Sequence, residues 1–283
     1  MTKVASGFNK PWASALLPDR RMLVTEKPTG TRYIVMPEGK QSPAIAGLPR
    51  VDGRGQGGLL DVELGPDYAQ SRLSSWTYGE PLKGGNGLAV ARARLVDGAK
   101  PRVEDVKLVF STLPTVEPTL HAGGRLAFAP DDKLLVMLEE RSILPGHVQA
   151  RDLKSHFEKS VRINPDGFVP RDNPFVGRKD ARPELSLDHR NILSAARDAQ
   201  QRLWIVEMGP RGGDERSTAP RPARTTAGPP SATTRSTLAS ASTSPPGSGH
   251  GAARVLLGPG HLPSGMNDDR VVSEERLLKL TPH

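Results

Sequence analysis

The sequence predicts an all-β protein whose antiparallel sheets repeat around an axis, a β-propeller. Composition is the first reason, because 29 glycines and 27 prolines in 283 residues, with 4% aromatic residues, favour turns over a helical bundle. The second reason is a repeated plan of a short apolar strand, a polar turn containing Asp, and another apolar strand. The plan occurs at Leu16–Glu26, Leu64–Tyr78 and Phe128–Leu138, and in a weaker form at Ala196–Gly209.

Each copy of this plan has the chemistry of a β-hairpin. Its apolar and β-branched runs predict strands, and its turn holds Pro18, Pro66 or Pro130 followed by Asp, or Asp198 in the weak copy. The uneven spacing of the turns suits four-stranded blades with loops of variable length, although a β-sandwich is an alternative. The main helical signal is a short turn at Ala150–Ser160.

Composition and charge also exclude several classes of function. Cysteine is absent, which excludes disulfides and cysteine nucleophiles. The net charge of +8 includes five arginines between Arg216 and Leu262, where Asp, Glu and Lys are missing, so the rest of the chain has an ordinary mixed charge. No basic stripe interleaves with aromatic residues, so we expect no nucleic-acid partner. No apolar run suits a membrane span, and Met1–Trp12 contains no apolar signal core.

Two loop segments offer polar side chains next to expected strands. Gln56 lies in a glycine-rich turn that does not match a dinucleotide-binding fingerprint, so by itself it reads as a loop residue. His121 lies in a loop just before the strand of the third repeat and is followed by two glycines, which permit close approach of a ligand. A structural or exposed histidine is the alternative interpretation.

Two further segments carry polar groups near the weak fourth repeat. His189, Arg190 and Asn191 are consecutive at a loop–strand junction, where Arg suits recognition of carboxylates or quinone oxygens; an exposed polar corner is equally consistent. The segment Val206–Glu215 combines backbone carbonyls with the carboxylates of Asp214 and Glu215. Such oxygen ligands favour calcium, although the spacing is not that of an EF-hand loop.

Taken together, these segments resemble one family. The motifs "GRGQGGLLDVELGPDYAQSRL", "HAGGRLAFAPD", "SVRINPDGFVPRDNPFVGR", "DHRN" and "GPRGGDE" occur in its order and approximate spacing. The chain resembles the soluble aldose sugar dehydrogenases of the glucose/sorbosone dehydrogenase family, which use pyrroloquinoline quinone (PQQ), from about Lys10 to Glu215. The resemblance implies a six-bladed β-propeller with PQQ and Ca²⁺ in a cleft at one face. About four blades are recognisable here, so the propeller is incomplete.

The resemblance also implies roles for individual residues. His121 would be the general base that removes the proton from the C1 hydroxyl of an aldose, as hydride passes to the quinone. Arg190 would stabilise charge on the quinone oxygens, and Asn191 and Gln56 would contact the cofactor. An external electron acceptor would complete the reaction, and the family would place the protein in the periplasm or outside the cell.

The same resemblance implies ligands for two calcium ions. Gly209 and Pro210 would offer backbone carbonyls to the calcium that polarises the quinone, and Glu215 would bind a second, structural calcium. The chain departs from the family pattern at Leu120, Asp188 and Met208, and the segment Leu138–Leu153 matches that pattern poorly. These departures favour a non-catalytic sugar-binding propeller or a defective relic as the alternatives to an enzyme.

The composition changes at Arg216. We expect a β-propeller over 1–215, a disordered segment over 216–262 that lacks aromatic residues, and a remnant of the propeller's C-terminal part over 263–283. Two stretches of the segment, "PARTTAGP" and "GSGHGAARVLLGPG", can be back-translated in displaced frames to "GKNYGWP" and "APGMEQPVYYWDP", motifs resembling the family's continuation. We therefore interpret 216–262 as out-of-frame translation after a frameshift, with a natural disordered insertion as the alternative. A propeller without complete closure is expected to be unstable.

Overall fold

The structure is a computed structural model that describes most of the chain up to residue 218 and one strand near its end. The described residues are 2–143, 146, 148–149, 152–178, 183–186, 189, 191–197, 201, 203–208, 214–218 and 276–279. Strands dominate these residues, and their helix is the single turn α1 (Tyr68–Ser71). The expectation of an all-β protein is confirmed.

The first two sheets are sequential antiparallel meanders. The first has the order β2–β3–β4, formed by β2 (Pro11–Leu16), β3 (Met22–Glu26) and β4 (Thr31–Val35). The second has the order β5–β6–β7–β8, formed by β5 (Leu59–Leu64), β6 (Leu73–Leu82), β7 (Gly85–Val96) and β8 (Arg102–Ser111).

The next two sheets follow the same sequential pattern. One runs from β9 to β12 in chain order, formed by β9 (Leu126–Phe128), β10 (Leu134–Met137), β11 (Ser160–Ile163) and β12 (Glu184–Ser186). The other has the order β13–β14–β15, formed by β13 (Ile192–Arg197), β14 (Leu203–Met208) and β15 (Asp214–Thr218). Strand β15 crosses the boundary expected at Arg216 by three residues, because they continue the antiparallel register with β14.

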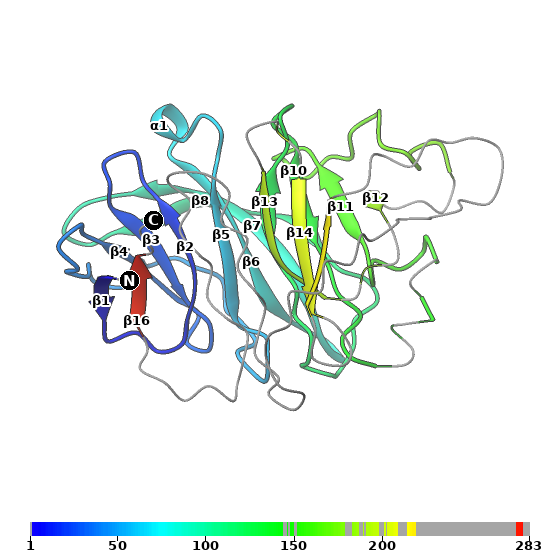
Figure 1. The fold of residues 1–283 in the computed structure, drawn as a ribbon, viewed down its shortest axis with the longest axis horizontal. Coiled ribbons are helices and arrows are strands. Elements are labelled where there is room, and N and C mark those ends of the chain that lie inside the picture. The colour runs from blue at the N-terminus through cyan, green and yellow to red at the C-terminus, as the bar shows by residue number, and fades with distance from the viewer. Residues whose placement is uncertain are drawn as a thin grey trace.

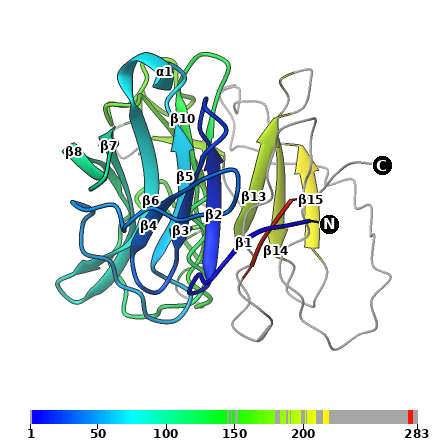
Figure 2. The same ribbon diagram turned by 90° about the vertical axis from the view of Figure 1, so that its left-hand side faces the viewer.

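The four sheets stand beside one another as blades (Figures 1 and 2). Successive sheets contact each other through their first strands, since β5 contacts β2, β9 contacts β5, and β13 contacts β9. A sandwich would instead pack two layers face to face. The expected propeller with about four recognisable blades is therefore confirmed.

The predicted polar turns connect the first two strands of the blades. In the first blade the Leu17 N–H donates to the Arg21 carbonyl at 2.7 Å, and in the third the Ala129 N–H donates to Lys133 at 2.8 Å. In the second blade the turn is extended by α1. At 152–160 the expected helical turn is replaced by irregular turns, because the Asp152 and Ser155 side chains bond nearby backbone N–H groups and compete with a helix.

The two ends of the described chain meet in a small additional sheet. Strand β1 (Thr2–Ser6) pairs antiparallel with β16 (Arg276–Lys279), which lies within 263–283 (Figure 1). On the N-terminal side, Ala5 and Phe8 pack with Met22, Val24 and Val35 of the first blade. This small cluster lies apart from the main apolar core, which extends across the first three blades.

Candidate active site

The loops that precede the first strands of three blades meet at one end of those strands. Gln56 precedes β5, His121 precedes β9 and Asn191 precedes β13, so the blade repeat brings three predicted site residues to the same end. A pocket of about 430 Å³ lies at the other end of these strands, where Glu63, Phe128 and other residues line it. That pocket is separate from the predicted site.

Gln56 and His121 are in direct contact. The Gln56 side-chain Oε1 accepts the His121 backbone N–H at 2.7 Å, and the Gln56 N–H donates to the Thr119 carbonyl at 2.8 Å. Gly55 has φ of +55°, and a β-carbon there would collide with Thr119, which explains a glycine in this turn. The glycine-rich turn therefore holds the loop that carries the histidine.

His121 has a buried acidic partner that the sequence analysis missed. Its Nδ1 lies 2.6 Å from Oε1 of Glu140, and the His121 side chain is 8% exposed while Glu140 is fully buried. A carboxylate partner accepts a proton from Nδ1, which leaves Nε2 as the basic nitrogen of the neutral ring. The signal in the sequence was the run Glu139–Glu140–Arg141 directly after an apolar strand.

Arg141 secures the segment that leads to His121. Its Nη2 donates to the Pro118 carbonyl at 2.5 Å and to Oδ1 of Asn86. The Asn86 amide in turn donates to the carbonyls of Val116, Glu117 and Pro118, each at 3.2 Å. The backbone before the histidine is thus held by buried side-chain hydrogen bonds.

Asn191 lies on the other side of the histidine loop. Its Oδ1 accepts the Gly123 N–H at 3.2 Å, and its backbone forms an isolated antiparallel bridge with Glu139. Burial raises the pKa of the Glu139 carboxyl to about 7, against the lowering effect of Arg141. By contrast, Nε2 of His189 lies 2.7 Å from the Ser186 hydroxyl, so His189 contacts the last strand of the third blade.

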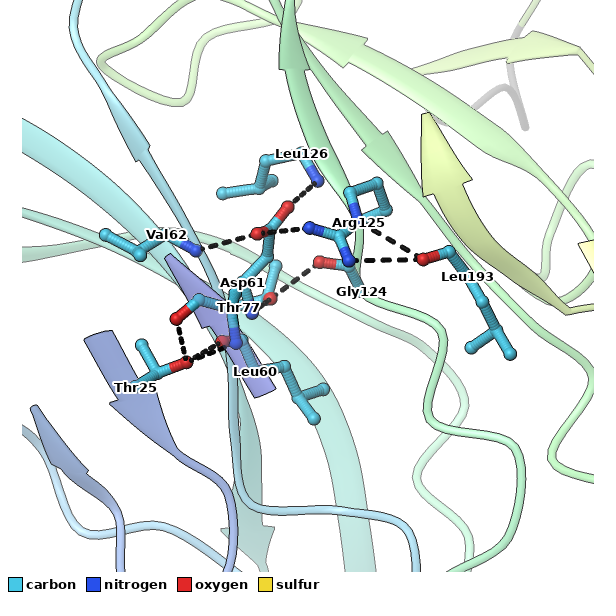
Figure 3. Close-up of polar contacts among 10 residues, drawn as sticks. Thr25, Leu60, Asp61, Val62, Thr77, Gly124, Arg125, Leu126 and Leu193 are labelled. Atoms are coloured by element: carbon cyan, nitrogen blue, oxygen red, sulfur yellow. Dashed lines mark hydrogen bonds and ion pairs between the residues drawn. The ribbon is translucent and has the colours of Figure 1, made fainter. Parts of the chain in front are cut away.

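A buried ion pair and its hydrogen bonds join the second, third and fourth blades behind this loop (Figure 3). Arg125 donates from Nη1 to Oδ1 of Asp61 at 2.7 Å and from Nε and Nη2 to the Leu193 carbonyl at 3.3 and 3.2 Å. Its guanidinium also lies 4.5 Å from the ring centroid of Trp12. Oδ2 of Asp61 accepts the Leu126 N–H at 2.7 Å. Because Arg125 is four residues after His121, the pair fixes the histidine loop relative to the blades.

Threonine hydroxyls reinforce the same junctions (Figure 3). Thr25 of the first blade donates to the Leu60 carbonyl of the second at 2.7 Å, and Thr77 of the second donates to the Gly124 carbonyl at 2.6 Å. Gly124 belongs to the double glycine after the histidine. The loop is therefore attached to its neighbouring blade through backbone as well as side-chain contacts.

Several predicted residues are not covered by this geometry. Arg190, Gly209 and Pro210 lie outside the described residues, and Glu215 is described only as a backbone position in β15 opposite Glu207. In the part of the chain that is described, no cluster of three His, Asp or Glu side chains suits a metal ion. The calcium assignment remains a prediction.

The described residues also contain no helix that is long and apolar enough to cross a membrane.

Comparisons with a family model and with known proteins agree on one family. The family model for Glucose / Sorbosone dehydrogenase matches residues 8–221. The chain is 40% identical to Aldose sugar dehydrogenase YliI of Escherichia coli over 212 residues, which are 74% of this chain and 56% of the relative. It is 26% identical to Quinoprotein glucose dehydrogenase B of Acinetobacter calcoaceticus over 235 residues, 75% of this chain and 48% of the relative.

A solved structure supports the same relationship. The PQQ-bound Aldose Sugar Dehydrogenase from Streptomyces coelicolor aligns with a TM-score of 0.68 and 31% identity, covering 79% of this chain and 64% of that one. This chain thus spans about half the length of the two curated relatives.

Proposed function

We propose that this chain, which belongs to the glucose/sorbosone dehydrogenase family, is an oxidoreductase that oxidises the C1 hydroxyl of an aldose with PQQ and Ca²⁺. The observation that carries the proposal is the buried His121–Glu140 pair at the end of the blades where Gln56 and Asn191 also lie. When bound, PQQ supplies the hydride acceptor and Ca²⁺ supplies Lewis-acid polarisation of its carbonyl.

His121 performs the proton transfer in this proposal. Glu140 accepts the Nδ1 proton at 2.6 Å, so Nε2 has the lone pair that takes the proton of the sugar C1 hydroxyl as hydride leaves C1. The Glu140 carboxylate then stabilises the imidazolium and keeps the ring in one orientation. The sugar loses two electrons and two hydrogens and becomes a lactone.

Cofactor and metal contacts complete the proposal. Asn191 has an Nδ2 group without a hydrogen-bond partner among the described residues, which fits a donor to an acceptor-rich quinone. Gln56 is assigned a cofactor contact, although its Oε1 is already engaged by His121. Arg190 is assigned the stabilisation of charge on the quinone oxygens.

The calcium ligands, the electron acceptor and the cellular location follow from the family. We assign the catalytic Ca²⁺ to the carbonyls of Gly209 and Pro210 and a structural Ca²⁺ to Glu215. An external acceptor must reoxidise the cofactor after each turnover. The family resemblance supports a periplasmic or extracellular location, which is part of the proposal.

The experiment combines the purified chain with PQQ, Ca²⁺, an aldose and an artificial dye acceptor. We expect dye reduction that His121→Ala abolishes, and Glu140→Gln should lower kcat at least about tenfold because general-base contributions are of that order or greater. Quinone binding and the Tm of each variant are measured in parallel, so that loss of chemistry is separated from loss of folding. Sugar binding without dye reduction would indicate a binding module, and the absence of both would indicate a relic.

A further inference from the structure

Two buried polar groups beside His121 have no hydrogen-bond partner among the described residues. They are Oε2 of Glu139 and Nδ2 of Asn191, on residues that are 1% and 0% exposed. An unsatisfied buried donor or acceptor costs about 1–3 kcal/mol, so a donor and an acceptor in one region suit a polar ligand.

The two groups belong to the same small region. Glu139 and Asn191 face each other in an isolated antiparallel bridge, and Oδ1 of Asn191 accepts the Gly123 N–H. A β-carbon on Gly123 would lie 2.5 Å from Oε2 of Glu139, so this carboxyl oxygen lies against the backbone two residues after His121. Glu140, the next residue in the chain, contacts His121.

Charged groups of both signs surround Glu139, and burial rather than these charges is the main cause that favours its neutral form. The surrounding groups are Glu140 and Arg141 on its own segment, His121 on the loop before β9, and Glu158 and Lys159 on the segment before β11.

The cation nearest to Glu139 is Arg141, and it only partly offsets the effect of burial on the pKa of this carboxyl. Nη1 of Arg141 is 3.5 Å from Oε1 of Glu139, while Nη2 is committed to Asn86 and the Pro118 carbonyl. Burial, together with the negative charge of Glu140, raises the pKa of Glu139 to about 7. The Glu139 side chain is therefore mostly a carboxylic acid, with a proton to donate, below about pH 7.

We propose that Glu139 is a cofactor-binding residue that donates its carboxyl proton in a hydrogen bond to an oxygen of the quinone, alongside the amide donor of Asn191. The inference rests on the proposed function, since it assumes that PQQ occupies this end of the blades. PQQ has quinone oxygens and ionised carboxylates, so its periphery is rich in acceptors. A neutral acid complements such a ligand, whereas an ionised Glu139 repels it.

The test is the pH dependence of PQQ binding to the full chain with saturating Ca²⁺, followed by tryptophan fluorescence and checked by equilibrium dialysis. Below neutral pH the Kd is expected to be constant, and above about pH 7 it should rise by about tenfold per pH unit because one proton is linked to binding. Glu139→Gln is the matched variant, because its amide keeps a donor of the same size and does not titrate. Its Kd should stay flat across the same range.

Two outcomes overturn the inference while leaving the proposed function intact. One is a wild-type Kd without pH dependence, and the other is a Glu139→Gln profile that follows the wild type. Any pH effect that the two proteins share cancels in their comparison. Absence of PQQ binding to a folded wild-type chain at every pH overturns the proposed function together with the inference. Thermal unfolding of each protein in each buffer establishes that it is folded.

Discussion

Replacing Arg125 with methionine should remove the contact that joins the four blades. The substitution deletes the ion pair with Asp61, both bonds to the Leu193 carbonyl and the stacking on Trp12, while an apolar side chain of similar length remains. The carboxyl group of Asp61 then stays buried without its cationic partner. Breaking a buried pair in this way costs about 3–5 kcal/mol, much more than an exposed pair contributes.

The assay is equilibrium unfolding by heat and by urea. For a domain of this size, a loss of that order lowers the Tm by roughly 6–20 °C. Arg94→Met is the matched control, since Arg94 pairs with Glu104 at 2.5 Å but is 43% exposed. The control should lose no more than about 1 kcal/mol.

The pair should also show coupling and a pH signature. Asp61→Asn keeps an acceptor for the nearby backbone N–H groups, so Arg125→Met/Asp61→Asn should cost less than the sum of the single substitutions. Burial raises the pKa of Asp61 even with Arg125 beside it, so the Arg125→Met defect should shrink in acid as Asp61 takes a proton. Two results would refute the reasoning. One is an equal loss of unfolding free energy for Arg125→Met and Arg94→Met, and the other is strict additivity of Arg125→Met and Asp61→Asn in the double-mutant cycle.

Three further predictions concern stability. Gly58→Ala should lower the free energy of unfolding, measured in urea, by more than about 3 kcal/mol, because φ is +121° and a backbone carbonyl occupies the space of the methyl group. The control Gly84→Ala, at φ +84° in open space, should lower it by only about 1 kcal/mol. The pKa of Glu139 in the folded state, about 7, exceeds its ordinary value of 4.5. Its contribution of about 3 kcal/mol to the free energy of unfolding is therefore present at low pH and lost as pH rises through 7. Glu139→Gln should flatten the curve of stability against pH, and an unchanged curve would contradict this. Arg32 is buried over Trp76, and its guanidinium nitrogens have no hydrogen-bond partner among the described residues. Arg32→Met should therefore leave the Tm unchanged or higher. A decrease of more than about 2 kcal/mol in the free energy of unfolding would disprove this prediction.

Local chemistry made much of the fold predictable from sequence. Proline and aspartate at the turns, with apolar runs on either side, determined the hairpins at Pro18 and Pro130 because these preferences act within a few residues. The same locality explains why His121 and Asn191 could be placed just before strands. The short helical turn expected at 150–160 was wrong over its described part, 152–160, since side-chain bonds to the backbone outweigh weak helix propensity there.

Contacts between distant segments were decided by the tertiary structure. Glu140 is the partner of His121 within the third blade, Arg125 contacts all four blades, and Glu139 of the third blade faces Asn191 of the fourth. These partners are distant in sequence, and their burial cannot be read from the order of residues. The sequence determined the repeating strands and the loops that carry polar groups. Packing the blades side by side determined which of those groups meet and how far each is removed from water, and that sets its charge.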